Sequence, residues 1–244
     1  MNLFDAAQLR MSVRAFCQEE LNKEVLMEID EFISNIERYA EEIDANIEIV
    51  KTIGKKLRPP YYAVLYSENK PGCYFNAGYM MQQLVLYLTS RGIGTCYKTF
   101  PIGIHNKDSL GRKYMICIAF GVPKEEMYRN PAKVDRNKID RICVEKSELT
   151  KDMRTLVDIA RISPSSFNNQ PWRFVISDGK IHIFKRKPGT ARVNNITDVD
   201  MGIMMSNIIT SAEELWIDIS VKCIQDIKDK KYSNNEYVAS IKMG

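Results

Sequence analysis

The segment from Ser163 to Phe174 gathers side chains that can bind a polar ligand. Its sequence is Ser-Pro-Ser-Ser-Phe-Asn-Asn-Gln-Pro-Trp-Arg-Phe. Pro164 and Pro171 disfavour helical geometry in the residue before each, so we expect a rigid loop after a helix, anchored by burial of Trp172. Hydroxyl and amide groups both donate and accept hydrogen bonds, which suits a heteroaromatic edge or a polyol. The loop offers such groups at Ser165, Ser166, Asn168 and Gln170. The alternative is a turn whose polar groups bond its own backbone.

Histidine and cysteine are placed in ways that argue against several other kinds of site. The two histidines, His105 and His182, lie in no nucleophile motif, so a Ser-His-Asp or Cys-His relay is not expected. His182 alternates with apolar residues, which predicts an outward-facing position on a strand. The six cysteines lie at least 21 residues apart, a spacing that predicts neither a metal site nor a disulfide framework. Any difficult chemistry is therefore expected to depend on a bound cofactor.

An internal repeat organises the chain. Three segments of the first half recur in the same order in the second half, at offsets of 124, 123 and 128 residues. They are Gly78–Leu84, Tyr114–Gly121 and Leu21–Lys23, which return as Gly202–Ile208, Tyr237–Gly244 and Leu149–Lys151. Coincidence among short apolar patterns is the alternative, but three matches at a nearly constant offset favour a duplication.

Each copy predicts the same opening elements. A helix comes first, with Asn22 or Thr150 as its N-cap and with apolar residues at helical spacing behind the cap. An apolar strand follows, at residues 61–66 in the first copy. In the second copy the strand at 173–177 turns through Asp-Gly into a second strand at 181–184, which is typical of a hairpin.

The later elements of each copy also correspond. A long helix begins near Tyr74 in one copy and near Asp200 in the other, and an apolar strand closes each copy. The intervening segment 123–144 is polar and contains Asn-Pro, so it is expected to be a connection rather than part of the core. The fold class is therefore α+β, with two similar halves that bury their faces against each other in one compact unit.

The composition is that of an ordinary globular protein. Of the 244 residues, 45% are hydrophobic and 27% are charged. Apolar runs such as 61–66 and 115–120 are far shorter than the roughly 18 residues that a membrane span needs. The N-terminus has no secretory pattern, so a cytoplasmic location is expected. The net charge of +4 is too small, and its basic residues too dispersed, to predict nucleic-acid binding.

Three motifs resemble those of the nitroreductase-like flavoprotein family, whose members bind FMN and typically reduce small electrophiles with NAD(P)H. The longest is Pro-Ser-Ser-x-Asn-x-Gln-Pro-Trp-x-Phe at residues 164–174. An Arg-x-Ser-x-Arg motif stands at residues 10–14 and is followed by Phe16. Gly-Ile-Gly-Thr-Cys-Tyr at residues 92–97 is similar to the family's Gly-Leu-Gly-Thr-Cys-Trp. The resemblance covers nearly the whole chain and implies a nitroreductase-like fold.

The order of these motifs departs from the usual family pattern. In the usual member the arginine motif and the Pro-Ser-Ser-x-Asn loop lie within one short stretch, whereas here 150 residues separate Arg14 from Pro164. Ordinary members form the FMN site across a homodimer interface. The resemblance therefore implies a fused dimer with one complete site, in which residues 1–125 supply the arginine motif and residues 126–244 supply a connector and the loop. This resembles the branch of nitroreductases in which a single chain mimics the dimer.

The resemblance also implies roles for the basic residues. Arg10 and Ser12 would face the phosphate and ribityl end of FMN, and Arg14 would lie nearer N1 and O2, where a cation stabilises reduced flavin. Arg136 resembles the family's late basic residue at the phosphate, and a solvated charge in the connector is its alternative.

The ring end of FMN would be shared between the two halves. Backbone groups of Tyr97, Lys98 and Thr99 would face the N5 edge, although Lys98 and Thr99 replace the family's usual glycine pair. The second half would contribute its loop, at Pro164, Ser165, Ser166 and Asn168.

The expected function is that of an FMN-dependent oxidoreductase. Hydride would pass from NADH or NADPH through flavin N5 to a small electrophilic acceptor, nitroaromatic-like or quinone-like, without a protein nucleophile. The alternative is a flavin-binding protein without turnover, used for storage or sensing, since the changes after Tyr97 could close the substrate face. We expect a monomeric fused pseudo-dimer with no membrane or nucleic-acid partner, and a further homodimer stays open.

Overall fold

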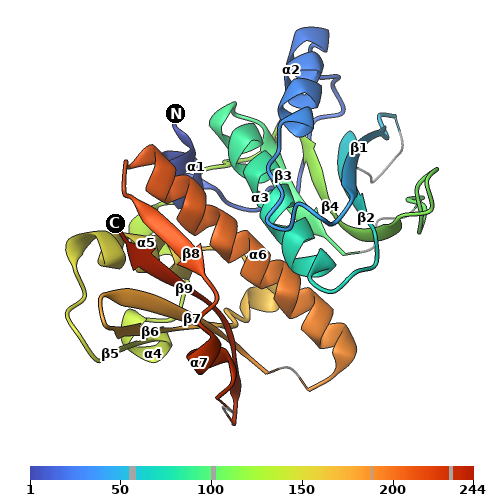
Figure 1. Ribbon diagram of the computed structural model, residues 1–244. Helices are drawn as coiled ribbons and strands as arrows, with labels where there is room; N and C mark the ends of the chain where they lie inside the picture. Colours follow the sequence, from blue (N-terminus) through green and yellow to red (C-terminus); the bar gives the residue numbers. More distant parts are fainter. Residues whose placement is uncertain (55–58, 100–102, 188, 231–232) are drawn as a thin grey trace.

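The protein consists of two α+β halves, each built around its own sheet (Figure 1). The structure is a computed structural model and describes residues 1–54, 59–99, 103–187, 189–230 and 233–244. The first sheet has the strand order β1-β2-β4-β3, and the second has the order β5-β6-β7-β9-β8. The first sheet comprises β1 (Ala45–Lys51), β2 (Tyr61–Ser67), β3 (Gly94–Lys98) and β4 (Lys113–Gly121). The second comprises β5 (Cys143–Glu145), β6 (Trp172–Ser177), β7 (Lys180–Arg186), β8 (Ile219–Lys222) and β9 (Asn235–Met243).

Two of the helices begin at the caps that the sequence predicts. Asn22 accepts a hydrogen bond from the backbone of Glu24, and Thr150 accepts one from Met153. Each cap satisfies a backbone donor that the first helical turn leaves without a partner. The helices are α1 (Leu3–Leu9), α2 (Lys23–Ser34), α3 (Cys73–Ser90), α4 (Ile139–Ile142), α5 (Lys151–Arg161), α6 (Ala191–Glu214) and α7 (Gln225–Lys228). Two 3₁₀ turns are η1 (Pro131–Lys133) and η2 (Ser166–Asn168).

The two sheets share one topology. Strands β1-β2-β4-β3 of the first sheet correspond to β6-β7-β9-β8 of the second, and all of these neighbours pair antiparallel. The register shifts between Leu65 and Tyr66 in the β2–β4 pair, and between Ile183 and Phe184 in the matching β7–β9 pair. The second sheet adds β5, which pairs parallel with β6 at the edge. The α+β fold class with two similar halves is thus confirmed.

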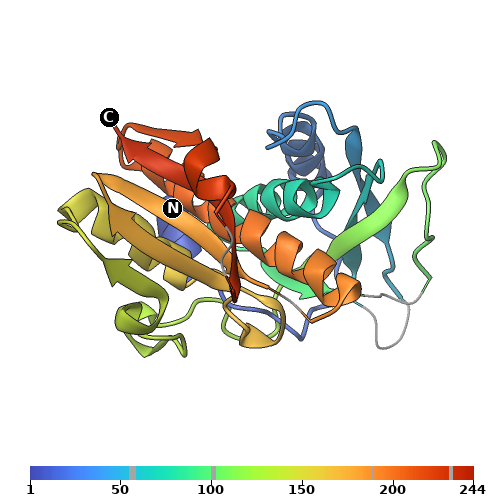
Figure 2. The same cartoon turned by 60° about the horizontal axis from the view of Figure 1, so that its bottom comes forward.

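The long helices α3 and α6 lie side by side between the sheets (Figures 1 and 2). They approach each other at the glycines of the repeated Gly-x-Met-Met motif. A Cβ atom on Gly78 would lie 2.1 Å from the carbonyl oxygen of Val199, and one on Gly202 would lie 2.0 Å from that of Phe75. Only glycine permits such a close approach of two backbones. The motif that revealed the repeat therefore marks the contact between the halves.

Each long helix also covers its own sheet. Buried methionines of α6 pack against Trp172 and Phe174 of β6, and buried residues of α3 pack against Leu65 of β2 and Phe120 of β4. The N-terminal helix α1 adds Ala6 to the core of the second half. The first residues of the chain thus pack on the two long helices, α3 and α6.

Three details differ from the expectations. Helix α6 begins at Ala191, nine residues before Asp200, because Thr190 caps it and its first turns are too polar to show an apolar pattern. The segment 123–144 is more than a connection, since it ends in β5 and buries Ile142.

The exposure of His182 also differs from the expectation of an outward-facing residue, although it does lie on the face of β7 opposite to the core residues Ile181 and Ile183. Its side chain is buried, and its Nδ1 lies 2.7 Å from Ser240 Oγ on the neighbouring strand β9. Burial lowers the pKa of this histidine, which agrees with a neutral ring inside the sheet.

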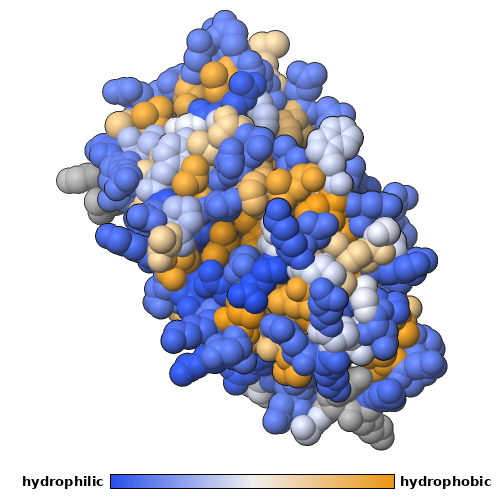
Figure 3. All heavy atoms as spheres, turned by 90° about the vertical axis from the view of Figure 1, so that its left-hand side faces the viewer, coloured by the Kyte–Doolittle hydropathy of each residue, from blue (hydrophilic) through white to orange (hydrophobic). Residues whose placement is uncertain are grey.

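The surface is largely hydrophilic on the face drawn in Figure 3, where apolar residues gather mainly toward the middle. Within the described residues, no helix has both the length and the apolar character that crossing a membrane requires.

Candidate functional site

A cavity of about 240 Å³ lies where the two halves meet. The N-terminal segment, β3 and β4 of the first half line it together with η2 and α6 of the second half. The lining residues are Ser12, Arg14, Cys96, Tyr97, Lys98, Thr99, Ile116, Pro164, Ser165, Ser166, Phe167, Asp200 and Ile203. Residues of the first half and residues of the second half thus line the same cavity.

Most of the predicted site residues meet at this cavity. Those that line it are Ser12, Arg14, Tyr97, Lys98, Thr99, Pro164, Ser165 and Ser166. Three others do not line it: Arg10 is buried behind Ser12, Arg136 bonds the carbonyls of Ser163 and Asp135, and Asn168 donates to Asp135.

The arginine motif is held against β3 by main-chain hydrogen bonds. The amide of Val13 donates to the carbonyl of Thr95 at 2.9 Å, and the Val13 side chain is fully buried against Gly94. Side chains alternate along an extended segment, so burial of Val13 leaves Ser12 and Arg14 on the opposite side. This alternation explains why both line the cavity.

The loop after α5 has an unusual backbone. Phe167, Asn168 and Gln170 all have positive φ angles, of 53°, 57° and 47°, although none of them is glycine. Such conformations cost free energy and persist only when the surroundings fix them. The amide of Gln170 donates to Ser165 Oγ at 3.0 Å, and its side-chain oxygen accepts from the amide of Asn137 at 2.7 Å. Gln170 is therefore structural, as the alternative interpretation of the loop predicts for part of it.

A chain of hydrogen bonds connects the two sides of the cavity through the α3–α6 contact. The Tyr97 hydroxyl donates to Gln82 at 2.9 Å, and Gln82 donates to Asn207 at 2.8 Å. Asn207 in turn donates to Ser163 Oγ at 2.7 Å. All of these side chains are polar and lie in or near the core, and each is a hydrogen-bond partner of the next. The chain links β3 of the first half to the start of the second-half loop.

Three arginines, Arg10, Arg129 and Arg136, are buried or partly buried close to the residues that line the cavity. Burial lowers the pKa of Arg10 to about 10, and burial with the nearby Arg10 and Arg136 lowers that of Arg129 to about 9. Burial also lowers the pKa of Arg136. None of the three forms an ion pair with a carboxylate in the described ranges, and Arg10 Nε has no hydrogen-bond partner there. Buried guanidinium groups that lack an ion-pair partner favour the binding of an anion.

Sequence reasoning missed Arg129 and Asp200. Arg129 donates to the carbonyls of Gln8 and Ile162, and so ties the end of α1 to the end of α5. Asp200 lines the cavity, and burial raises its pKa to about 7 although Ser166 donates two hydrogen bonds to it. The repeat places it at the position of Asn76 in the other copy, but neither its residue type nor its spacing assigns it a role.

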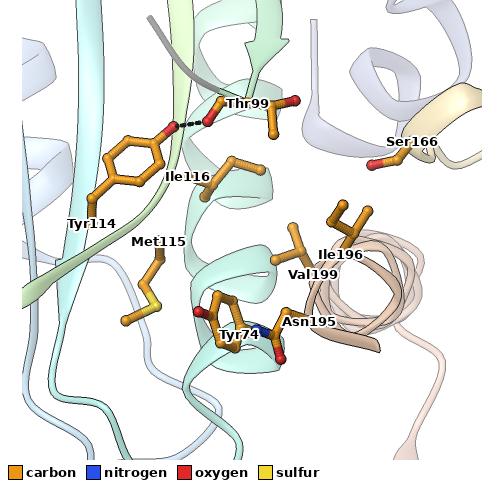
Figure 4. A pocket seen from close by; sticks show the side chains of 9 residues that line it. All are labelled: Tyr74, Thr99, Tyr114, Met115, Ile116, Ser166, Asn195, Ile196 and Val199. Carbon is orange, nitrogen blue, oxygen red and sulfur yellow. Dashed lines mark hydrogen bonds between the residues drawn. The ribbon is translucent and has the colours of Figure 1, made fainter. Parts of the chain in front are cut away.

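A second cavity of about 170 Å³ adjoins the first and shares Thr99, Ile116 and Ser166 with it (Figure 4). Its other lining residues are Tyr74, Tyr114, Met115, Asn195, Ile196 and Val199. The Tyr114 hydroxyl donates to the carbonyl of Thr99 at 2.8 Å, as the dashed line shows. The walls are mostly apolar and aromatic, and no charged side chain is among the described residues that line this second cavity. Such walls suit a flat, uncharged molecule.

The equivalent place in the other copy is filled by aromatic rings. Val199 and Ile203, which line the cavities, correspond to Phe75 and Tyr79 at the repeat offset of 124 residues. The ring of Tyr39 packs on both of these, with centroid distances of 4.7 Å to Phe75 and 5.5 Å to Tyr79. Three large rings therefore occupy the side of the helix pair that mirrors the cavity.

Comparison with known proteins agrees with this architecture. A solved structure described as a nitroreductase from Thermotoga maritima has a TM-score of 0.67 and 22% identity, and the match covers 99% of this chain and 93% of that one. Shorter matches include a nitroreductase-like protein from Bacillus cereus, at TM-score 0.44 and 16% identity over 62% of this chain and 97% of that one. Another is a nitroreductase with bound FMN from Desulfitobacterium hafniense, at TM-score 0.42 and 14% identity over 57% of this chain and 100% of that one. A search of curated proteins finds no match.

The family comparison matches nearly the whole chain. The family model described as "Putative TM nitroreductase" matches residues 2–212, a range that contains the arginine motif, both long helices and the Pro-Ser-Ser-x-Asn loop. Because this match covers well over half of the sequence, the protein belongs to that nitroreductase family.

Proposed function

We propose that the protein is an FMN-dependent oxidoreductase whose single flavin site is built from both halves of one chain. The observation that carries the proposal is the shared cavity, in which Ser12 and Arg14 of the first half face Ser165 and Ser166 of the second. The halves that we propose are residues 1–125 and 126–244. A chain of this kind needs no second subunit to complete the site, so a monomer is the expected active form.

The buried arginines fit the phosphate of FMN. Arg136 lies close enough to Arg10 to lower its pKa further, and neither arginine forms an ion pair within the described residues. The free Nε of Arg10 is a buried donor that a phosphate oxygen would satisfy. Ser12 accepts from Arg10 at 3.3 Å and can donate its own hydroxyl proton to the same ligand.

The cavity walls fit the ribityl chain and the ring. The hydroxyls of Ser165 and Ser166 suit a polyol, and the backbone of Lys98 and Thr99 offers amide groups beside the ring edge. Arg14 is exposed at the cavity and can stabilise negative charge on the ring. We also assign Asn168 to this site, as a residue that holds the loop from behind through Asp135.

Bound FMN would supply hydride chemistry, accepting hydride from NADH or NADPH and passing it to a small electrophile. The protein's own residues would hold the ring and exclude water. The adjoining cavity of Figure 4 would receive the nicotinamide and then the acceptor, since its aromatic and apolar walls suit flat rings such as nitroaromatics and quinones.

Flavin reconstitution followed by anaerobic reduction tests this function. Purified protein mixed with excess FMN and then desalted should retain the flavin absorbance, and NADH or NADPH should bleach it without oxygen. Addition of a quinone or a nitroaromatic compound should then restore the colour. Failure to retain FMN would refute the proposal, whereas retention without bleaching would favour a storage or sensing role.

A further inference from the structure

Asp200 is a buried carboxyl group in the wall of the candidate flavin cavity. Its Oδ1 accepts hydrogen bonds from the amide of Ser166 at 2.9 Å and from its hydroxyl at 3.1 Å. The residue is only 3% exposed, and it forms no ion pair in the described part of the chain although Arg14 and Lys98 line the same cavity. A carboxylate in this position loses hydration without gaining a charge partner, which favours its protonated form.

The other half of the chain shows what the fold itself requires at this position. Asn76 corresponds to Asp200 at the repeat offset of 124 residues, since each stands two residues before the glycine at the helix contact. Asn76 Oδ1 accepts from the amides of Tyr39 and Ala40, at 2.8 and 3.2 Å. In both halves a side-chain oxygen of the long helix thus holds the loop that follows the first capped helix. A neutral amide is sufficient for this task, so the acidity of Asp200 needs another explanation.

We propose that Asp200 is a proton-binding group of the flavin cavity, and that binding of a flavin ring is coupled to uptake of a proton by its carboxyl group. This inference rests on the proposed function and deepens it. A ring that fills the cavity displaces the water that still reaches the carboxyl group, and so makes the charged form less favourable. Each hydride delivered to a neutral acceptor must be followed by a proton, and a group that holds one at the cavity wall suits that reaction.

The charged groups that face Asp200 do not cancel this effect. Lys98 and Tyr97 face it from β3, and Arg14 faces it from the N-terminal segment. Ser166 of η2 donates to it, which favours the carboxylate, yet burial still raises the pKa to about 7. Arg14 is exposed and Lys98 is half-buried, so water screens the attraction of their charges for the carboxyl group. The desolvation of the buried carboxyl group is not reduced in this way. Further desolvation by a ring therefore acts in the same direction.

Calorimetry with riboflavin tests the coupling, because riboflavin has the ring of FMN but no titrating phosphate. Titrations at pH 8 in two buffers of different ionisation enthalpy measure the number of protons taken up on binding. The wild-type protein should take up close to one proton, and its affinity should fall by up to about tenfold per pH unit from pH 7 to 8.5. Asp200→Asn should take up none and bind riboflavin with constant affinity over this range.

Two features make the comparison decisive. Asp200→Asn keeps the acceptor that Asn76 supplies in the other half, so the loop should stay in place and the melting temperature should be retained. Glu213→Gln is the matched control, since Glu213 is an acidic residue of the same helix, has a pKa raised by desolvation, and lies outside the flavin cavity. This control should behave as the wild type.

Equal proton uptake in wild type and Asp200→Asn, or none in the wild type, would overturn the inference while leaving the flavin site intact. Absence of riboflavin and FMN binding in all three proteins would overturn the proposed function together with it.

Discussion

Replacing Gly202 with alanine should push helices α3 and α6 apart and so weaken the contact between the two halves. The added Cβ would lie 2.0 Å from the carbonyl oxygen of Phe75 and 2.8 Å from the amide nitrogen of Tyr79. Ordinary van der Waals contact begins at 3.4 Å, so the nearer contact is about 1.4 Å too short. Both clashing atoms belong to the backbone of α3, which cannot move away as a flexible side chain can.

The size of the effect follows from two opposing terms. Alanine is favoured over glycine inside a helix by about 1 kcal/mol. Overpacking of a rigid core by one carbon typically costs about 1–3 kcal/mol, and a clash with backbone belongs at or beyond the upper end. The helix pair must also open, which loosens the buried side chains along α3 and α6. We expect a net loss of at least about 2 kcal/mol of unfolding free energy, or roughly 4–8 °C in Tm for a chain of this length.

Thermal unfolding followed by circular dichroism measures this loss, with Gly189→Ala as the matched control. Gly189 has open space around its Cβ position and no positive φ, so alanine there should leave Tm within about 1 °C. FMN affinity should fall in Gly202→Ala as well, because the cavity is assembled across the same helix contact. A Gly202→Ala protein as stable as the wild type would show that the helices are not in backbone contact, and would refute this account of the interface.

Four further outcomes are expected. Titration should saturate at one FMN per chain, because Tyr39 and its neighbouring rings fill the equivalent place in the other copy; two equally tight sites would contradict this. Arg10→Ala should weaken FMN binding by about ten- to a hundredfold and riboflavin binding much less, as measured by fluorescence quenching, because only FMN offers a phosphate. Trp216→Gly should raise Tm by about 1–3 °C, since Trp216 is 95% exposed at a φ of 56°, a conformation that glycine adopts without strain; an unchanged or lower Tm would count against it. Between pH 4 and 7 the folded protein keeps a proton on Asp200 that the unfolded chain releases, so its unfolding free energy should fall with rising pH by up to about 1.4 kcal/mol per unit relative to Asp200→Asn. Urea denaturation at several pH values measures this, and the same pH dependence of the unfolding free energy in both proteins would exclude it.

The sequence alone determined the elements that depend on local patterns. The caps at Asn22 and Thr150, the strand at 61–66 and the Asp-Gly hairpin all follow from residue types within a few positions of one another. The internal repeat predicted more of the fold, because a duplicated sequence pattern predicts duplicated structure, and the two sheets do share one topology. The motifs at residues 10–14 and 164–174 likewise predicted two sides of one cavity.

Local sequence patterns predicted less well those features that tertiary packing decides. His182 alternates with apolar residues as an exposed strand residue would, yet its side chain is buried in the second sheet, where Ser240 on the paired strand satisfies it with a hydrogen bond. The start of α6 was equally hidden, since its first turns are polar and are stabilised by contacts such as that of Lys185 with Asp198 rather than by an apolar stripe.

Only the tertiary structure decided which side chains reach the cavity. Arg10 carries the same charge as Arg14, but Arg10 stands at the C-terminal cap of α1, where its side chain is buried and donates to Ser12. Arg14 lies further along, on the extended segment, and lines the cavity. Asp200 gave no sign of its role until α3 and α6 were placed together, because a carboxyl group becomes a proton-binding group through burial and through the absence of a charge partner. Both properties depend on atoms brought together from distant parts of the chain, so residue type and spacing alone cannot specify them.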